Sequence, residues 1–264
     1  MLDLTLFRKP AFAGASISAF ALSASMFSMF LYITLYVQNA LGLSPQATGL
    51  RFLPLTLVSF FAAPISGKLS ERLPMRLFFG TGMTLVGIGL LLMSGLGAAS
   101  HWAHLLPGFI VAGAGIGMCN PALAQTAVGV VPPQRSGMGS GINNTFRQVG
   151  IATGIAGLGA LFQHLLETKV PQALSAAAPQ GAAGFARIPS EVLASGNPGV
   201  VTHGVSGAAA APLRHAFLGA YTDALNELFV IAAAIALTGA VLSALLVRSR
   251  DFVGAPVPAS AAAG

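Results

Sequence analysis

Charged residues are scarce in this chain, and their scarcity narrows the class of protein that it can be. Only 8% of its 264 residues are charged, whereas soluble globular domains carry roughly 25%. Acidic residues are fewer than basic ones, with seven Asp and Glu against thirteen Lys and Arg. Hydrophobic residues make up 55% of the chain, and it contains 32 glycines. Such a composition is typical of helices that pack closely in lipid, where small residues let backbones approach each other. It predicts an integral membrane protein and argues against a soluble domain.

Other absences exclude further classes of protein. A single cysteine, Cys119, allows no internal disulfide. The apolar runs hold no Ser/His/Asp set and no paired carboxylates, so we expect no enzyme and no cofactor. His101 and His104 stand without a third ligand, and we expect no metal site. The net charge of +6 does not predict nucleic-acid binding, because the basic residues lie in short segments between apolar runs.

Six apolar runs are long enough to span a bilayer, which takes about 20 residues. They predict an all-α protein whose residues 11–250 form a bundle of six membrane-spanning helices: 11–37, 47–66, 77–97, 105–131, 138–162 and 224–247. The segment 163–215 is rich in Ala, Gly, Ser and Pro, and we expect an external, largely irregular loop with a short helix capped by Ser190. Residues 1–10 are expected to form a cytoplasmic lead-in and residues 251–264 a cytoplasmic tail.

The segment 67–76, GKLSERLPMR, sets the expected orientation of these helices. It places four charges, three of them basic, between two long apolar runs, and so predicts a tight turn on the cytoplasmic face. Counted from a cytoplasmic N-terminus, the inner segments hold eight of the thirteen basic residues, while the short outer turns 38–46 and 98–104 hold none. Both termini are therefore expected in the cytoplasm. The eight are Arg8, Lys9, Lys68, Arg72, Arg76, Arg135, Arg248 and Arg250.

The fifth run carries two unusual features. Gly137 with Gly141, and Gly150 with Gly154, have the small-xxx-small spacing that brings membrane helices into close contact. Arg147 places a charge within the apolar span, which costs at least about 2.5 kcal/mol on insertion scales. We therefore expect its side chain to face protein or water rather than lipid.

Several motifs in register resemble a known family. The lead-in DLTLFRKPAF, the stretch YVQNALGLSPQATGLRFLPLTL, the turn GKLSERLPMR and the run VPPQRSGMGSGINNTFRQVG are similar to the C-terminal half of the fourteen-helix drug/proton antiporters, the DHA2 type of the major facilitator superfamily. The resemblance covers Leu2 to Phe162, and the sixth helix fits more loosely. Pro74 stands in the turn where the superfamily usually has a glycine.

This resemblance implies a fold and a partner. Two three-helix repeats of inverted topology would form the bundle, with the first, second, fourth and fifth helices facing a central cavity and the other two facing lipid. In that family the lead-in follows eight earlier helices, whereas here it follows Met1. We therefore expect half of a transporter, which self-pairs, joins a separate N-terminal half, or is a non-functional fragment or a misassigned gene start. We favour the last two.

Candidate site residues fall into two groups. Polar residues of the cavity-facing helices are expected to bind substrate: Tyr32, Asn120, Asn143, Asn144, Arg147 and Gln148. Residues of the cytoplasmic turn are expected to gate the transporter by latching one conformation: Gly67, Glu71, Arg72 and Arg76. Alternatives remain open for each group. Arg147 can instead snorkel and bind a neighbouring helix's carbonyls, the polar and aromatic stripe around Phe27, Phe30 and Tyr32 can serve packing, and the turn can be purely topogenic.

The expected function is efflux of small amphipathic organic molecules across a bacterial inner membrane by proton-coupled alternating access. Aromatic and thioether side chains on the first helix, such as Phe27 and Met29, would suit a greasy substrate. No acid lies in the middle of any of the six runs, and Asp223 and Glu227 lie at the outer start of the sixth. A proton-carrying carboxylate would therefore come from the missing half. The rival interpretation is a non-transporting subunit that binds another membrane protein.

Overall fold

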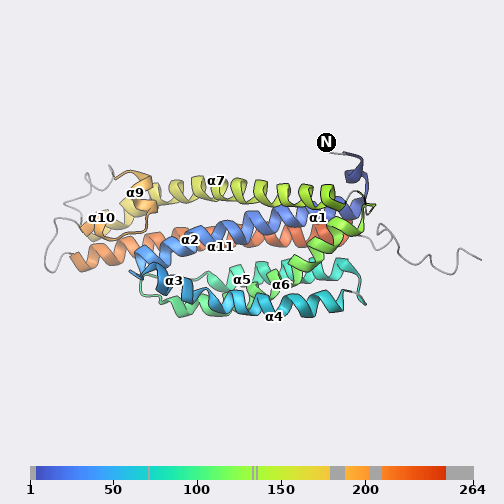
Figure 1. The fold of residues 1–264 in the computed structure, drawn as a ribbon. Coiled ribbons are helices and arrows are strands. Elements are labelled where there is room, and N and C mark those ends of the chain that lie inside the picture. Colours follow the sequence, from blue (N-terminus) through green and yellow to red (C-terminus); the bar gives the residue numbers. More distant parts are fainter. Residues whose placement is uncertain are drawn as a thin grey trace, which may run out of the picture.

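The computed structural model describes residues 4–70, 72–132, 134, 136–178, 188–202 and 210–247. All elements formed by these residues are helices, and strands are absent from them. Six of the helical stretches are long and apolar enough to cross a membrane. They lie side by side along one long axis, with α7 on one side, the first span and α11 in the middle, and α4, α5 and α6 on the other side (Figure 1). The prediction of an all-α, six-helix membrane bundle is confirmed.

The first span runs unbroken through the middle of the bundle. It consists of α1 (Pro10–Leu22), the π-helical turn η2 (Ser23–Phe27), α2 (Ser28–Leu35) and a second π-helical turn, η3 (Tyr36–Ala40), after a 3-10 helix η1 (Leu4–Arg8). Pro10 suits the first position of the helix, because the N–H that proline lacks would have no helical partner there. In η2, the hydroxyl of Ser28 donates to the carbonyl oxygen of Ser23, 3.2 Å away and five residues back.

The second and third spans form an antiparallel pair around the turn at 67–76. The second consists of α3 (Pro45–Arg51) and α4 (Leu53–Leu69), and the third is α5 (Met75–Met93). Ser44 caps α3, since its hydroxyl accepts a hydrogen bond from the backbone N–H of Ala47 at 3.2 Å. The second span is the least buried of the six, and Phe60 on α4 is 71% exposed.

The fourth span is packed by glycines on two of its faces. It consists of η4 (Trp102–Leu105) and α6 (Leu106–Gly129). A Cβ atom on Gly113 or Gly117 would press against backbone carbonyls of α4, and one on Gly115 would press against the carbonyl of Gly82 on α5. Glycine thus lets α6 lie directly against both α4 and α5. At its end, the ammonium of Lys9 donates a 2.6 Å hydrogen bond to the carbonyl oxygen of Val130, which caps the helix C-terminus.

The fifth and sixth spans are much longer than a bilayer requires. They are α7 (Ser136–Ala177), with 42 residues, and α11 (Ala210–Leu246), with 37. The helix expected to end at 162 therefore continues through the first part of the expected loop at 163–215. Its extension is stabilised by an apolar stripe at helical spacing, in which Leu166, Val170 and Leu174 are buried. Two short helices lie between the long ones, α9 (Ser190–Ala194) and α10 (Gly199–Thr202), and Ser190 is the first residue of α9 rather than its cap.

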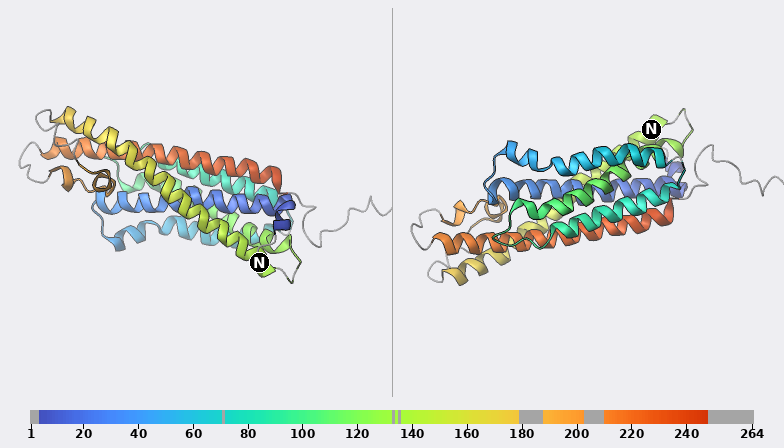
Figure 2. Two further views of the ribbon diagram at one scale, coloured as in Figure 1. Left: turned by 90° about the horizontal axis from the view of Figure 1, so that it is seen from above. Right: turned by 90° about the horizontal axis from the view of Figure 1, so that it is seen from below.

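One of the two predicted glycine pairs makes the expected helix contact. Gly150 and Gly154 of α7 lie against the first span, where an added Cβ would meet the carbonyl oxygens of Phe20 and Ala24. Gly137 and Gly141 face open space instead. As Figure 2 shows, α7 crosses the other helices at a slant, so only part of its length is in close contact with the first span.

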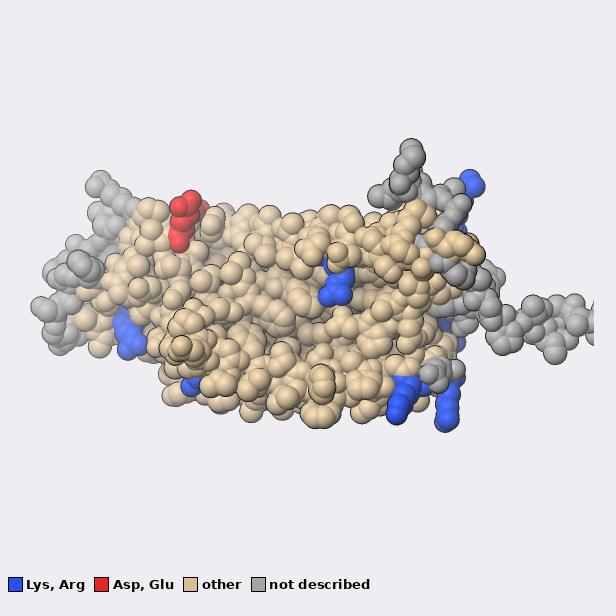
Figure 3. All heavy atoms as spheres, in the orientation of Figure 1, with Lys and Arg blue, Asp and Glu red and all other residues tan. Residues whose placement is uncertain are grey.

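The two ends of the bundle differ in charge. The end that holds the N-terminal helix and the turn between α4 and α5 has five basic residues and no acid among the residues that the structure describes, and we call it the basic end: Arg8, Lys9, Lys68, Arg72 and Arg76. Basic and acidic groups both appear towards the opposite end in Figure 3. The opposite end, called the far end, holds α3, α9 and α10 (Figure 1). Most of the face drawn in Figure 3 is free of charge, although a basic group interrupts it between the two ends.

Candidate functional site

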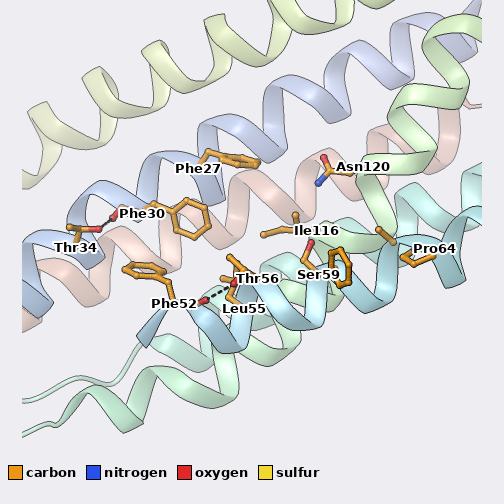
Figure 4. A pocket seen from close by; sticks show the side chains of 12 residues that line it. Phe27, Phe30, Thr34, Phe52, Leu55, Thr56, Ser59, Pro64, Ile116 and Asn120 are labelled. Carbon is orange, nitrogen blue, oxygen red and sulfur yellow. Dashed lines mark hydrogen bonds between the residues drawn. The ribbon is translucent and has the colours of Figure 1, made fainter. Parts of the chain in front are cut away.

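An apolar cavity of about 770 Å³ opens between the first, second and fourth spans (Figure 4). Aromatic rings cover much of its wall. Phe27 packs edge-to-face on Phe30, with ring centres 5.6 Å apart, and Phe30 packs edge-to-face on Phe52 at 5.7 Å. The full set of described lining residues is Phe27, Phe30, Thr34, Phe52, Leu55, Thr56, Ser59, Phe60, Ala63, Pro64, Ile116 and Asn120. Cavities of this size suit drug-sized organic molecules.

A second cavity of about 440 Å³ lies between α6 and α7, closer to the basic end. Its wall is more polar than that of the first. The described residues lining it are Asn120, Leu123, Ala124, Gln125, Ala127, Val128, Ser140, Asn143, Asn144 and Arg147. The side-chain amide of Asn143 donates to the carbonyl oxygen of Leu123 at 3.3 Å, which ties α7 to α6 beneath the cavity.

The two cavities adjoin each other at three side chains. Asn120 lines both of them. Phe27 lines the apolar cavity, and the guanidinium carbon of Arg147, which lines the polar cavity, lies 5.6 Å from the centre of the Phe27 ring. This distance allows a cation–π contact. We treat the two cavities as one groove with an aromatic part and a polar part, and refer to it as the groove.

Asn120 occupies an electrostatically unusual position at this junction. Its side-chain oxygen is buried and has no hydrogen-bond partner among the residues that the structure describes. The next residue, Pro121, lies inside α6 and has no N–H to donate to the carbonyl four residues back. Figure 4 shows the Asn120 side chain at the end of the aromatic cavity. A buried polar group without a partner is costly, so a hydrogen-bond donor of a bound molecule would be stabilised by this oxygen.

Four of the six predicted substrate-binding residues line the groove: Asn120, Asn143, Asn144 and Arg147. All four come from α6 and α7, and the three on α7 share one face because they are three and four residues apart. Arg147 is half-buried, and no hydrogen bond joins it to a carbonyl within the described part of the chain. The alternative in which Arg147 binds neighbouring carbonyls therefore finds no support in its contacts.

Tyr32 and Gln148 do not come to the groove. The Tyr32 side chain is buried between the first span and α7, where its hydroxyl donates to the carbonyl oxygen of Ile155 at 2.8 Å. Its ring packs edge-to-face on Phe162, with centres 5.5 Å apart. Gln148 is exposed and lines neither cavity, because it follows Arg147 by one residue and points about 100° away around the helix.

Sequence reasoning missed the aromatic residues that the second span contributes to the groove. Phe52 and Phe60 both line the aromatic cavity. They are eight residues apart, about two helical turns, and so share a helix face. That spacing could have indicated that both rings line one cavity, but two phenylalanines on one face of an apolar membrane helix are equally expected to face lipid.

The predicted gating residues Gly67, Arg72 and Arg76 lie at the basic end and line neither cavity. Glu71 falls outside the described residues. Arg72 and Arg76 are exposed, and neither is paired with any residue that the structure describes. The carbonyl oxygen of Gly67 accepts a 2.7 Å hydrogen bond from the Ser70 hydroxyl, which also bonds to the side-chain oxygen of Gln125 at 2.9 Å. The turn is thus joined to α6 through Ser70, a residue that sequence reasoning did not single out.

Six helices that are long and apolar enough to cross a membrane, with a groove along one side, define the fold of an integral membrane protein. Residues 3–155, more than half of the chain, match the family described as the Major Facilitator Superfamily. The chain belongs to that family. The resemblance found in the sequence is confirmed at the level of the superfamily.

Similarity to individual proteins extends this comparison. The multidrug resistance protein Stp of Mycobacterium tuberculosis is 31% identical over 179 residues, which cover 68% of this chain and 33% of Stp. The multidrug efflux pump LfrA of Mycolicibacterium smegmatis is 28% identical over 170 residues, 64% of this chain and 34% of LfrA. An uncharacterized MFS-type transporter of M. tuberculosis is 29% identical over 245 residues, 91% of this chain and 33% of that protein. The chain spans about a third of the length of the relatives it matches.

Proposed function

We propose that this chain forms one bundle of a transporter that exports small amphipathic organic molecules. The observation that carries the proposal is the groove, in which an aromatic part and a polar part meet at Asn120. An amphipathic molecule has the same division, with an apolar body and a polar head. The names of Stp and LfrA, a multidrug resistance protein and a multidrug efflux pump, support this class of substrate.

The groove is open on one side, and we propose that a second helical bundle closes it. Large apolar side chains flank the opening on α4: Phe60, Phe61 and Ile65 are 71%, 63% and 66% exposed. The partner would be a further six-helix bundle or a second copy of this chain. Rocking of two bundles about the groove would give alternating access, the mechanism common to transporters built from such repeats.

Proton coupling is proposed to depend on a carboxylate outside this groove. The acids among the described residues are Glu167, Glu191, Asp223 and Glu227, and none of them lines either cavity of the groove. Glu227 is paired with Lys169 at the far end. If the transporter exchanges substrate for protons, the second bundle must supply the titrating group.

The chain is proposed to span a bacterial inner membrane with its basic end on the cytoplasmic side, so that both termini are cytoplasmic. Five described basic residues gather at this end, and an excess of Lys and Arg in short loops marks the cytoplasmic side of membrane proteins. The turn at 67–76 would then act as a gate on the inner face, with Gly67, Glu71, Arg72 and Arg76 holding one of the two conformations.

Substrate accumulation in a pump-deficient bacterium tests the proposed export. One strain expresses residues 1–264 alone, and a second expresses a chimaera in which this chain replaces the matching third of Stp. Immunoblots of membrane fractions confirm insertion in both. We expect the chimaera to lower the accumulation of a fluorescent amphiphile, and Asn120→Leu to abolish that effect. A well-inserted chimaera that exports nothing, beside an active Stp, would favour the rival function of a non-transporting subunit.

A further inference from the structure

The groove holds a positive charge and no negative one among its described lining residues. Arg147 is the only charged side chain in either of the two sets that line it. The charge is set within the helical span of α7, far from both helix ends, where a cation without a counter-charge is costly. A bound anion would remove that cost.

The guanidinium of Arg147 is free to bind such an anion. Its contact with the described residues is the cation–π contact with Phe27, which occupies a face of the guanidinium and leaves its N–H groups for other partners. Arg51, an arginine of the second span, is different. It donates to the carbonyl oxygen of Ala47 at 2.8 Å, lies over the Trp102 ring at 5.2 Å, and lines neither cavity.

The surroundings of Arg147 fit a carboxylate. A guanidinium binds a carboxylate through two parallel N–H···O bonds. Asn144, three residues before Arg147, is exposed on the same helix face, and its side-chain amide can donate to an acceptor in the polar part of the groove. The aromatic part begins directly beside this point, because the Phe27 ring contacts the guanidinium from the other cavity.

We propose that the groove selects amphipathic molecules with an acidic head, and specifically aromatic carboxylates, over molecules with a cationic head. The carboxylate lies against Arg147, with the Asn144 amide beside it. The flat apolar body lies among the edge-to-face rings of Phe27, Phe30 and Phe52. A cationic head in the same place would face Arg147 with no acid nearby to balance it. This inference rests on the proposed function and names the head group of its substrate.

A matched pair of probes separates the effect of the head group from that of the body. Anthracene-9-carboxylate and 9-(aminomethyl)anthracene share one ring system and differ in the sign of the head charge. Purified chain, residues 1–264, is placed in nanodiscs of phosphatidylcholine, and binding is followed by fluorescence anisotropy. We expect the carboxylate to bind about tenfold more tightly, since a hydrogen-bonded charge pair contributes roughly the free energy of one decade in affinity.

Three variants of groove residues and one control variant assign this preference to residues. Arg147→Gln is expected to bring the two probes to similar affinities, and Arg147→Lys to keep the sign of the preference with a smaller ratio, because lysine lacks the fork of N–H donors. Phe52→Ala is expected to weaken both probes by the same factor. Arg51→Gln removes the same charge from another span and is expected to leave the ratio unchanged.

The possible outcomes distinguish this inference from the proposed function. Equal affinity of the wild-type chain for both probes would overturn the acidic-head inference and leave a binding groove in place. Binding of neither probe would contradict the proposed function itself. Loss of carboxylate binding when phosphatidylglycerol is added to the nanodiscs would overturn the inference too, because Arg147 would then serve an anionic lipid headgroup. A ratio that survives in Arg147→Gln would place the selection elsewhere.

Discussion

The hydroxyl of Tyr32 donates a 2.8 Å hydrogen bond to the carbonyl oxygen of Ile155, and so joins the first span to α7 within the bundle. Tyr32→Phe keeps the ring and removes this bond. We expect it to lower the stability of the bundle by about 0.5–1.5 kcal/mol and to leave binding of the anthracene probes unchanged. Thermal unfolding in detergent and a binding titration measure the two effects. Altered probe affinity with unaltered stability would show that Tyr32 belongs to the groove after all.

Glycine at position 154 is required by the close approach of α7 to the first span. A Cβ there would press against Ser28 and Ala24, whereas one at Gly141 would meet open space. Gly154→Ala should therefore destabilise the bundle by about 1–3 kcal/mol, the usual cost of overpacking. Gly141→Ala is the matched control and should be neutral or stabilising by up to about 1 kcal/mol, because alanine favours helix. Similar melting temperatures for the two variants would contradict this contact.

Asn226 anchors α11 to the end of α5 through two reciprocal hydrogen bonds. Its amide donates to the carbonyl oxygen of Leu96 at 2.8 Å, and its carbonyl oxygen accepts from the Leu96 N–H at 3.0 Å. In Asn226→Asp the donor is replaced by an oxygen that faces the Leu96 carbonyl, so we expect a loss of about 1–3 kcal/mol in stability. The control is Asp223→Asn at the same end, where the side chain is exposed. A melting temperature of Asn226→Asp equal to that of the control would count against the anchor.

The gating proposal predicts that Glu71→Gln changes the balance between inward-open and outward-open states. Loss of the negative charge would weaken pairing with basic groups of the cytoplasmic turn. Because Cys119, the sole cysteine, is buried, a cysteine placed at Thr56 in the groove can be labelled against a silent background. We expect Glu71→Gln to alter the rate at which an impermeant maleimide labels that cysteine in the Stp chimaera. Arg214→Gln, at an exposed site on α11, serves as control, and equal rates in both would argue against a latch.

The membrane-spanning core of this fold could be predicted from the sequence because hydrophobicity alone specifies it. Each apolar run became a helix, since backbone groups in lipid must be paired within their own segment. The extension of α7 to Ala177 could not be read in this way. Residues 163–177 mix polar and apolar side chains, and their helix is stabilised by packing against neighbouring elements rather than by lipid.

The surroundings of a site residue can be predicted from the sequence when exposure of its side chain to lipid is energetically costly. They cannot be predicted when the side chain is stable in several environments. Arg147 lines the polar part of the groove, and that its side chain faces protein or water rather than lipid stays a prediction, made because a charge in lipid is costly. Tyr32 was expected to bind substrate, whereas its hydroxyl donates to a backbone carbonyl of α7. The sequence does not distinguish these two partners of a tyrosine hydroxyl. Phe52 lines the groove beside Phe30 of the first span, a ring contact that sequence periodicity does not specify.

The π-helical turn η2 (Ser23–Phe27) sets the angular register of everything that follows it in the first span. Each residue advances an α-helix by about 100°, so one residue accommodated in a wider turn rotates the rest of the helix by that amount relative to an unbroken α-helix. Phe30 and Thr34 face the groove in the present register. If the same residues formed an unbroken α-helix, both side chains would rotate off the groove, whereas deletion of one residue that closes the wide turn would return them to it. The wall of the groove is thus encoded as much by a count of residues as by their identities.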